Sequence, residues 1–324
     1  MSRAAVWALL AVAAAAIGAG PACAQSYPTR PVKIIVPFPA GGPLDVLGRA
    51  MADKLAASLK QPFIIENRVG AGGNTGSDAA AKSAPDGYTL LLVLSSTLTV
   101  NPALYPKMPF DPEKDLRLIT IATSSSQLLV VHPSLPVHSV KEFVAHASRE
   151  PIAYAHAGPG SPGHLMMEFF RLYAGFKAQP VPYRGNSLLV TDLIGGQIKA
   201  GFVGAGGLFQ HVRDGKVRAL AISSATAARS PLLPDVPSIV ESGYPDVRYG
   251  AYFLLAAPAG VPDGIAEVIE REARAALQSP DIKDKLRTVD IQVLATTSAE
   301  ARTIVKAEAE TMARVVKATG MRID

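Results

Sequence analysis

The chain has 324 residues, of which 48% are hydrophobic and 18% charged, so it is long enough for two globular domains. Lys and Arg exceed Asp and Glu by five, without a basic run, and this pattern gives no support to nucleic-acid binding. The one cysteine, Cys23, lies in a segment that we expect to be removed. Disulfides, thiolate catalysis and cysteine metal sites are then excluded.

A secretory signal is predicted in the first 24 residues. Arg3 is their only charged residue, an apolar run covers 4–17, and an A-x-A motif ends at Ala24. These features predict cleavage before Gln25 and a mature protein in the periplasm, since no later segment offers the roughly 20 apolar residues of a membrane anchor. A lipoprotein acylated at Cys23 is the alternative, which the preceding glycine and proline disfavour.

The next part of the chain alternates short apolar strands with helices. Residues 32–37 (VKIIVP) predict a buried strand, the loop FPAGG follows, and the helix that begins at Pro43 has apolar residues every three or four positions. Further strands are expected at 63–66 and 88–94, with a helix at 77–84 between them. Such units in succession predict parallel strands joined by right-handed crossovers, hence a doubly wound sheet.

A second series of the same kind begins near Gln127 and predicts a second lobe. Its expected elements are a strand LLVVHP, helices at 140–148, 164–176 and 187–194, and strands at 152–155 and 180–185.

The C-terminal third has too few strands for another domain. Helices are expected at 263–278 and 298–319, with the strand IQVLAT between them, and we assign them to the first lobe. The predicted lobes are 25–125 with 249–324, and 126–248, joined by two hinge crossings near Ser125 and Tyr249. Because ligands of open α/β sheets bind at the carboxyl ends of strands, the cleft between the lobes is the expected site.

One glycine motif resembles a dinucleotide fingerprint. Gly158, Gly160 and Gly163 have the spacing G-x-G-x-x-G between a strand and a helix. The following strand ends in Tyr183-Arg184-Gly185, without the acid that would hold a ribose, and two prolines remove N–H donors from the loop. What remains is a glycine loop that opens a helix, an arrangement suited to one carboxylate.

Catalytic and metal-binding patterns are missing from the sequence. Ser161 is not part of G-x-S-x-G, H-E-x-x-H does not occur, and the six histidines lack ligand spacing. His164, just inside a helix, caps or packs there more readily than it acts as a base, though a place in the ligand site stays open for it. Asp45 satisfies the N-terminal donors of its own helix better than it serves a ligand. We therefore expect no catalytic residue, no metal and no cofactor.

Nine segments carry a family resemblance, and they occur in one order along nearly the whole mature chain. They are YPTRPVKIIVPFPAGGPLD, ENRVGAGGNTG, APDGYTLLL, NPALYPKMPFDPEKD, VPYRG, TDLIGGQI, VRALAISSA, RSPLLPDVPSIVESGYP and APAGVP. Together they resemble the Bug family, the TctC-like solute receptors of tripartite tricarboxylate transporters. The resemblance implies an α/β type II periplasmic-binding-protein fold with two doubly wound lobes. It also implies a receptor, not an enzyme, for citrate-like acids, acidic amino acids or aromatic acids.

The resemblance further implies that two glycine loops, one per lobe, grip a ligand carboxylate through backbone groups and ordered waters. The loop after the third strand would complete the wall of the first lobe, and Asp45 and the ends of two later strands are added to the expected set. The expected ligand-binding residues are Phe38, Ala40, Gly41, Gly42, Asp45, Ser95, Ser96, Thr97, Gly160, Ser161, Gly163, His164, Tyr183, Arg184, Val203 and Gly204.

Two departures from the family pattern bear on the ligand. Ser161-Pro162-Gly163 offers fewer hydroxyl groups than relatives have at the second glycine loop. Val203 and Gly204 stand where many relatives have Asp-Asn, and a valine cannot balance a ligand ammonium. The sequence therefore favours a di- or tricarboxylate or an aromatic acid over an amino acid.

Three functions remain open at this point. A transport receptor would be a monomer that delivers its carboxylate to one small and one large membrane subunit. A sensory receptor would use the same cleft to signal to a sensor kinase. An enzyme on this fold would need an acid, base or nucleophile, for which only His164 and Ser161 are at hand.

Overall fold

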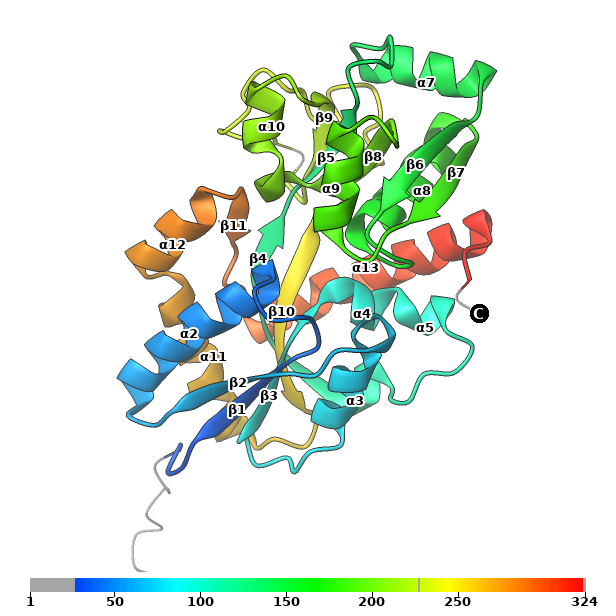
Figure 1. The fold of residues 1–324 in the computed structure, drawn as a ribbon. Coiled ribbons are helices and arrows are strands. Elements are labelled where there is room, and N and C mark those ends of the chain that lie inside the picture. Colours follow the sequence, from blue (N-terminus) through cyan, green and yellow to red (C-terminus); the bar gives the residue numbers. More distant parts are fainter. Residues whose placement is uncertain (1–26, 227, 323–324) are drawn as a thin grey trace, which may run out of the picture.

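The computed structural model describes residues 27–226 and 228–322, which form two lobes with one β-sheet each (Figure 1). The predicted signal segment lies outside the described residues. The first sheet has the order β11-β4-β10-β3-β1-β2, with β1 (Val32–Val36), β2 (Phe63–Asn67), β3 (Thr89–Leu94), β4 (Leu116–Ser125), β10 (Ala251–Pro258) and β11 (Ile291–Val293). The second has the order β7-β6-β8-β5-β9, with β5 (Gln127–Val131), β6 (Ile152–His156), β7 (Ala178–Pro182), β8 (Ala200–Gly204) and β9 (Arg218–Ser223).

The two sheets are mixed, whereas the sequence predicts parallel ones. Strands β1, β2 and β3 are parallel, as are β6, β7 and β8. In contrast, β10 is antiparallel to β3 and β4, and β5 is antiparallel to β8 and β9. Both β5 and β10 begin where the chain has just entered their lobe, so they run away from the boundary between the lobes. Their antiparallel neighbours, β8 and β9 for β5 and β3 and β4 for β10, run toward that boundary.

The chain passes between the sheets twice. β4 ends at Ser125 and β5 begins two residues later, so the first passage is very short. The second runs from the end of β9 at Ser223 to the start of β10 at Ala251 and contains no regular helix or strand within its described residues. We propose that the lobes divide at Ser125 and Tyr249, within these passages.

Helices cover both faces of the first sheet. On one face, Leu47 and Met51 of α2 (Pro43–Leu59) share a core with Ile269 of α11 (Asp263–Leu277). On the other face, Ala80 of α3 (Asn74–Ala81) packs with Ala301 of α13 (Ser298–Thr319). No helix within residues 27–226 and 228–322 combines the length and hydropathy of a membrane span. The remaining helical segments are η1 (Ala71–Gly73), α4 (Ser95–Thr99), α5 (Asn101–Leu104), α6 (Pro112–Asp115), α7 (Val140–Arg149), α8 (Pro162–Ala174), α9 (Asn186–Ile194), η2 (Ala205–Gly207), α10 (Phe209–Arg213) and α12 (Pro280–Arg287).

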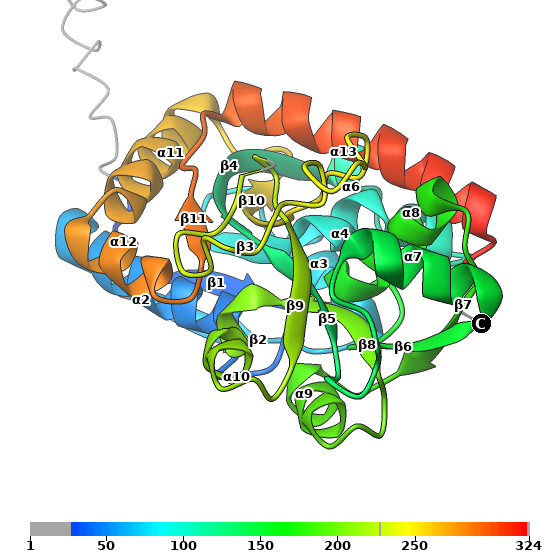
Figure 2. The ribbon, with the colours of Figure 1, turned by 90° about the horizontal axis from the view of Figure 1, so that it is seen from above.

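The C-terminal helix α13 contacts both lobes. Its first turns pack on the first sheet through Ala301, and its last turns place Met312 and Val315 in the core of the second lobe. Figure 2 shows the helix running from beside β4 to beside α8, in agreement with its contacts to both. Leu104 of α5 belongs to that same second core, so apolar packing is continuous across the boundary between the lobes.

Candidate ligand-binding cleft

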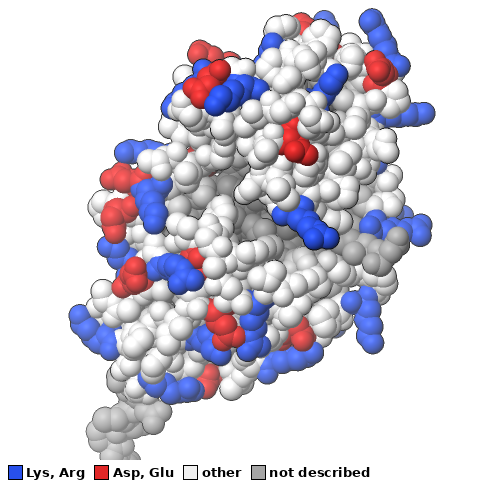
Figure 3. All heavy atoms as spheres, in the orientation of Figure 1, with Lys and Arg blue, Asp and Glu red and all other residues white. Residues whose placement is uncertain are grey.

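The two predicted glycine loops lie at the boundary between the lobes. The first follows β1 and leads into α2, and the second follows β6 and leads into α8. A Cβ atom on Gly160 would lie 3.0 Å from Leu104 Cδ1, so the second loop directly faces α5 of the first lobe. Figure 3 shows the surface hollowed between the lobes, with walls that are mostly uncharged and a few Lys or Arg side chains at the rim.

Asp45 holds the first glycine loop in place. Its Oδ2 accepts hydrogen bonds from Gly41 N at 3.0 Å and Arg49 Nε at 2.9 Å, and its Oδ1 accepts from Arg49 Nη2 and Asn67 Nδ2 at 3.0 Å each. Asn67 also donates to Phe38 O at 3.0 Å. The bonds from Arg49 are the main reason why the pKa of Asp45 falls to about 2. The carboxylate is thus committed to the loop, and the Gly41 N–H is committed to the carboxylate.

The segment after β3 was predicted as a loop but forms the short helix α4, and two of its hydroxyl groups bond to the protein. Ser95 Oγ donates to Glu308 Oε1 of α13 at 2.9 Å, and Thr97 Oγ1 donates to Gly72 O at 3.0 Å. Ser96, between them, is buried and forms no hydrogen bond through Oγ to another described side chain or backbone group. Of the three predicted hydroxyls, Ser96 is therefore the one left for a ligand.

The sequence did not predict a role for Glu308, which contacts α4 through Ser95. Its Oε2 is out of contact with solvent and has no hydrogen-bond partner among the described residues. Desolvation raises the pKa of Glu308 to about 8, against the smaller opposing effect of the Ser95 hydrogen bond. Tyr249 and Tyr252 lie near enough for Glu308 to raise the pKa of both phenols, in addition to their own burial. Burial therefore favours the protonated form of this carboxyl group.

His164 organises the second glycine loop as a neutral acceptor. Its Nδ1 accepts a hydrogen bond from Gly160 N at 3.1 Å, which requires the proton to be on Nε2. Its ring stacks on that of His156, with centroids 4.2 Å apart and planes 16° apart. Burial, followed by repulsion from His156, lowers the pKa of His164 to about 3. The Gly160 N–H is consequently not free for a ligand.

Ser161 and Gly163 have different roles at the start of α8. Ser161 is the N-cap residue, but it makes no side-chain capping bond, and its buried Oγ has no partner within the described chain. A Cβ atom on Gly163 would overlap the carbonyl oxygen of Phe202 in β8. Gly163 thus allows the helix to approach the sheet, and Ser161 presents an unused hydroxyl.

The predicted residues at the ends of β7 and β8 are only partly available. Tyr183 OH donates to Asp192 Oδ2 at 3.0 Å, and Arg184 is exposed. Val203 is 2% exposed and lies in the apolar core with Leu128 and Leu189, so it does not line the cleft. Gly204 ends β8 close to Asn186, whose Nδ2 would be 3.9 Å from a Cβ atom there.

Comparison with known proteins decides the family. The model of the tripartite tricarboxylate transporter family receptor, TctC, matches residues 47–321. This chain belongs to the TctC family. The resemblance stated from the nine segments is confirmed. A similar curated protein is BugT of Bordetella pertussis, 37% identical over 308 residues that cover 94% of each chain.

Solved TctC-like structures confirm the two-lobe fold. One is the R. palustris protein Rpa4515 with adipate, with a TM-score of 0.82, 31% identity and coverage of 92% of this chain and 100% of that one. Another is MatC (Rpa3494) from Rhodopseudomonas palustris with bound malate, with a TM-score of 0.78, 30% identity and coverage of 90% and 100%. The TctC family is one of periplasmic solute-binding receptors, and these two similar structures hold the dicarboxylates adipate and malate.

No group of three or more His, Cys, Asp or Glu side chains suited to a metal ion occurs within the described ranges. Of the predicted ligand-binding residues, Ser161 has a hydroxyl group without a partner in the described chain, and the one acid, Asp45, is already paired. This chemistry suits an anionic ligand held by hydrogen bonds.

Proposed function

We propose that the protein is a periplasmic receptor that binds a small organic carboxylate in the cleft and delivers it to a tripartite transporter. Its partners would be one small and one large membrane subunit, and the receptor itself would act as a monomer. The ligands of Rpa4515 and MatC, adipate and malate, support a carboxylate.

The single observation that carries the proposal is the free N-terminus of α8. Ser161 leaves its own Oγ unpaired within the described chain, and the first N–H groups of the 13-residue helix, those of Gly163 and His164 after Pro162, have no side-chain cap. Such a terminus carries partial positive charge and unpaired donors, which a carboxylate satisfies. At the first loop, α2 also begins without a side-chain cap, after Gly42. The two lobes therefore offer one donor site each.

A non-amino acid is the favoured ligand, for a reason other than the one drawn from Val203. That side chain is in the core, so its replacement of an acid cannot by itself set the selectivity of the cleft. Asp45, however, has both oxygens occupied by Gly41, Arg49 and Asn67. An ammonium group in the cleft would find no free carboxylate among the predicted site residues, and a buried unpaired charge is costly.

Titration calorimetry tests the proposal with malate, adipate, succinate, citrate, nicotinate and terephthalate against aspartate and glutamate. At least one acid without an amino group should bind more tightly than either amino acid. Ser161→Ala should weaken the binding of that acid by roughly 1 kcal/mol or more. Small molecules retained through native purification, identified by mass spectrometry, extend the panel. Tightest binding of an amino acid would reject the selectivity, and binding that is unchanged in Ser161→Ala would move the site away from α8.

A further inference from the structure

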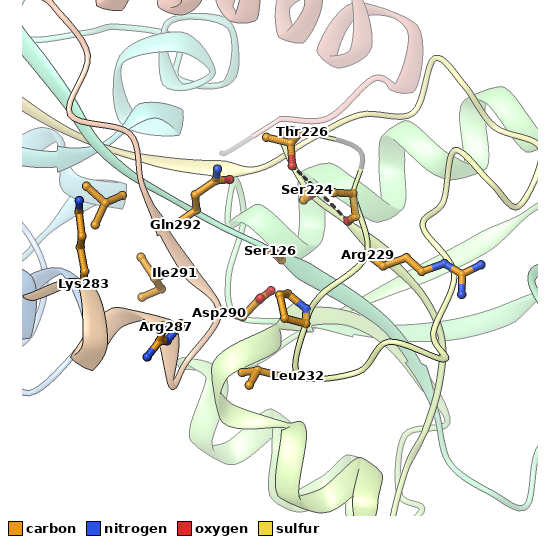
Figure 4. A pocket seen from close by; sticks show the side chains of 13 residues that line it. Ser126, Ser224, Thr226, Arg229, Leu232, Lys283, Arg287, Asp290, Ile291 and Gln292 are labelled. Carbon is orange, nitrogen blue, oxygen red and sulfur yellow. Dashed lines mark hydrogen bonds between the residues drawn. The ribbon is translucent and has the colours of Figure 1, made fainter. Parts of the chain in front are cut away.

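A pocket of about 430 Å³ lies where the chain passes between the lobes, and none of the predicted ligand-binding residues lines it (Figure 4). Ser126 of the first passage and Ser224 of the second form part of its wall. The other side comes from α12 and the start of β11 in the first lobe. The pocket is therefore bounded by both passages and by both lobes.

Asp290 places an incompletely bonded carboxylate in this pocket. Its Oδ1 accepts a hydrogen bond from Ser230 Oγ at 2.8 Å. Its Oδ2 is out of contact with solvent and has no hydrogen-bond partner within the described part of the chain. Buried carboxylate oxygens are normally satisfied, so the free oxygen marks a place for a donor. The residue also has a φ of +54°, a strained conformation of the kind that is common at binding sites.

The basic residues around the pocket do not neutralise Asp290. Arg229 donates to Glu241 at 2.9 Å and to Pro234 O at 3.0 Å. Arg287 donates to Asp284 at 3.0 Å. Lys283 is exposed and forms no ion pair with Asp290. Figure 4 shows the guanidinium groups of Arg229 and Arg287 directed away from the Asp290 carboxylate, so neither of them pairs with it.

The remaining walls combine apolar surface with hydroxyl groups. Leu232, Ile291 and Val293 supply hydrocarbon, and Ser126 and Ser224 lie beside them. A ligand with a cationic, hydrogen-bonding head and a short hydrocarbon body matches this lining, because the head can donate to a carboxylate while the body covers apolar surface. An inorganic metal ion matches it less well, since no further acidic or histidine ligand joins Asp290 in a group of three within the described residues.

We propose that this pocket is a second ligand site, which binds a small organic ammonium ion with its nitrogen on the Asp290 carboxylate and its hydrocarbon against Leu232 and Ile291. The site is separate from the carboxylate cleft. Its ligand would touch both lobes, so binding would favour the arrangement of the lobes seen in this structure, in which Asp290 and Leu232 both line the pocket.

The test uses three probes of equal chain length on the unmodified protein: n-butylammonium, butyrate and 1-butanol. Ligand-observed NMR and calorimetry should show binding of n-butylammonium, with at least tenfold weaker binding of the other two. Equal or tighter binding of butyrate or 1-butanol would overturn the proposal, and so would no binding of the ammonium ion. Malate and adipate titrations are run separately, so failure of one site is distinguishable from failure of the other.

Asp290→Asn locates the site. Asparagine tolerates a positive φ and can still accept from Ser230, so the fold should be retained. The variant should bind n-butylammonium with an affinity at least tenfold lower than that of the native protein. Asp281→Asn is the matched control, since this exposed acid on α12, the helix before Asp290, pairs with Lys54 and does not line the pocket. Unchanged affinity in Asp290→Asn, or an equal loss in both variants, would place the ammonium elsewhere.

Discussion

Ser95 Oγ donates a hydrogen bond to Glu308 Oε1 at 2.9 Å, across 213 positions of the sequence. It joins the start of α4, at the cleft, to the middle of α13. The partner is a carboxyl group whose other oxygen is buried and has no hydrogen-bond partner in the described part of the chain. The protonation state of Glu308 on the C-terminal helix therefore affects a hydrogen bond of α4, which we propose to face the ligand.

Glu308→Gln should flatten the dependence of stability on pH above pH 4.5. The pKa of Glu308 rises from 4.5 to about 8 on folding, so between these values the folded state holds a proton that the unfolded state has lost. Stability of the native protein then falls as pH rises through this range, by roughly 3 to 5 kcal/mol at most. Urea unfolding at pH 5 and pH 8.5 measures the difference. The exposed Glu310→Gln is the control, and parallel profiles for Glu308→Gln and the native protein would contradict the prediction.

Gly163→Ala should destabilise the fold by about 3 kcal/mol or more. The new Cβ atom would overlap the carbonyl oxygen of Phe202, which is backbone and cannot move aside without shifting β8. Gly264→Ala is the matched control. That glycine lies in α11 with no atom within 4 Å of an added Cβ, and alanine should be neutral or stabilising there. Thermal unfolding compares the two, and similar melting temperatures would show that α8 does not lie this close to β8.

His164→Asn should remove a loss of stability in acid. The pKa of His164 falls from 6.5 to about 3 on folding, so the unfolded state takes up a proton first as pH falls through this range. The native protein is thereby destabilised between pH 6.5 and pH 3. Asparagine Oδ1 can replace Nδ1 as the acceptor for Gly160 without titrating. Unfolding at pH 7 and pH 4 gives the test, with the exposed His138→Asn as control. Equal acid sensitivity in all three proteins would refute the neutral, buried histidine.

Ligand binding should draw the lobes together. Each lobe contributes one of the two glycine loops, and their contacts with one ligand are complete only when the lobes approach. Small-angle scattering should give a smaller radius of gyration with the tightest carboxylate of the calorimetric panel than without it. Superimposable scattering profiles with and without saturating ligand would contradict the prediction that the lobes close.

Much of the fold is predictable because local pattern and final structure agree. The strand at 32–37, its glycine loop and the helix from Pro43 appear as β1 and α2. Two strands were not predicted, β4 and β10, although they are the longest strands among the described residues. Both are almost fully buried and have no strict alternation of apolar and polar residues, so periodicity does not distinguish them from other apolar segments.

The positions of the two glycine loops follow from the sequence, but the hydrogen-bond partners of the groups around them do not. Glycine-rich turns after strands identify where a ligand can approach, but which donors stay free depends on partners distant in sequence. Ser95 is engaged by Glu308 and Tyr183 by Asp192. Val203 was wrongly expected at the surface of the cleft, because the direction of a strand's last side chain follows from the packing of α9 and not from the motif.

The helix α13 acts as a strut fastened at both ends. Ala301 anchors one end in the first core, and Met312 and Val315 anchor the other in the second. We expect such a helix to permit rotation of the lobes about the helix axis more readily than wide opening of the cleft. Wide opening would pull the apolar side chains at one end of the helix out of their core. The amplitude of lobe motion is thus limited by the solvation cost of a few apolar side chains on a single helix. We therefore expect the C-terminal helix, through its packing in both cores, to limit how far the lobes can separate.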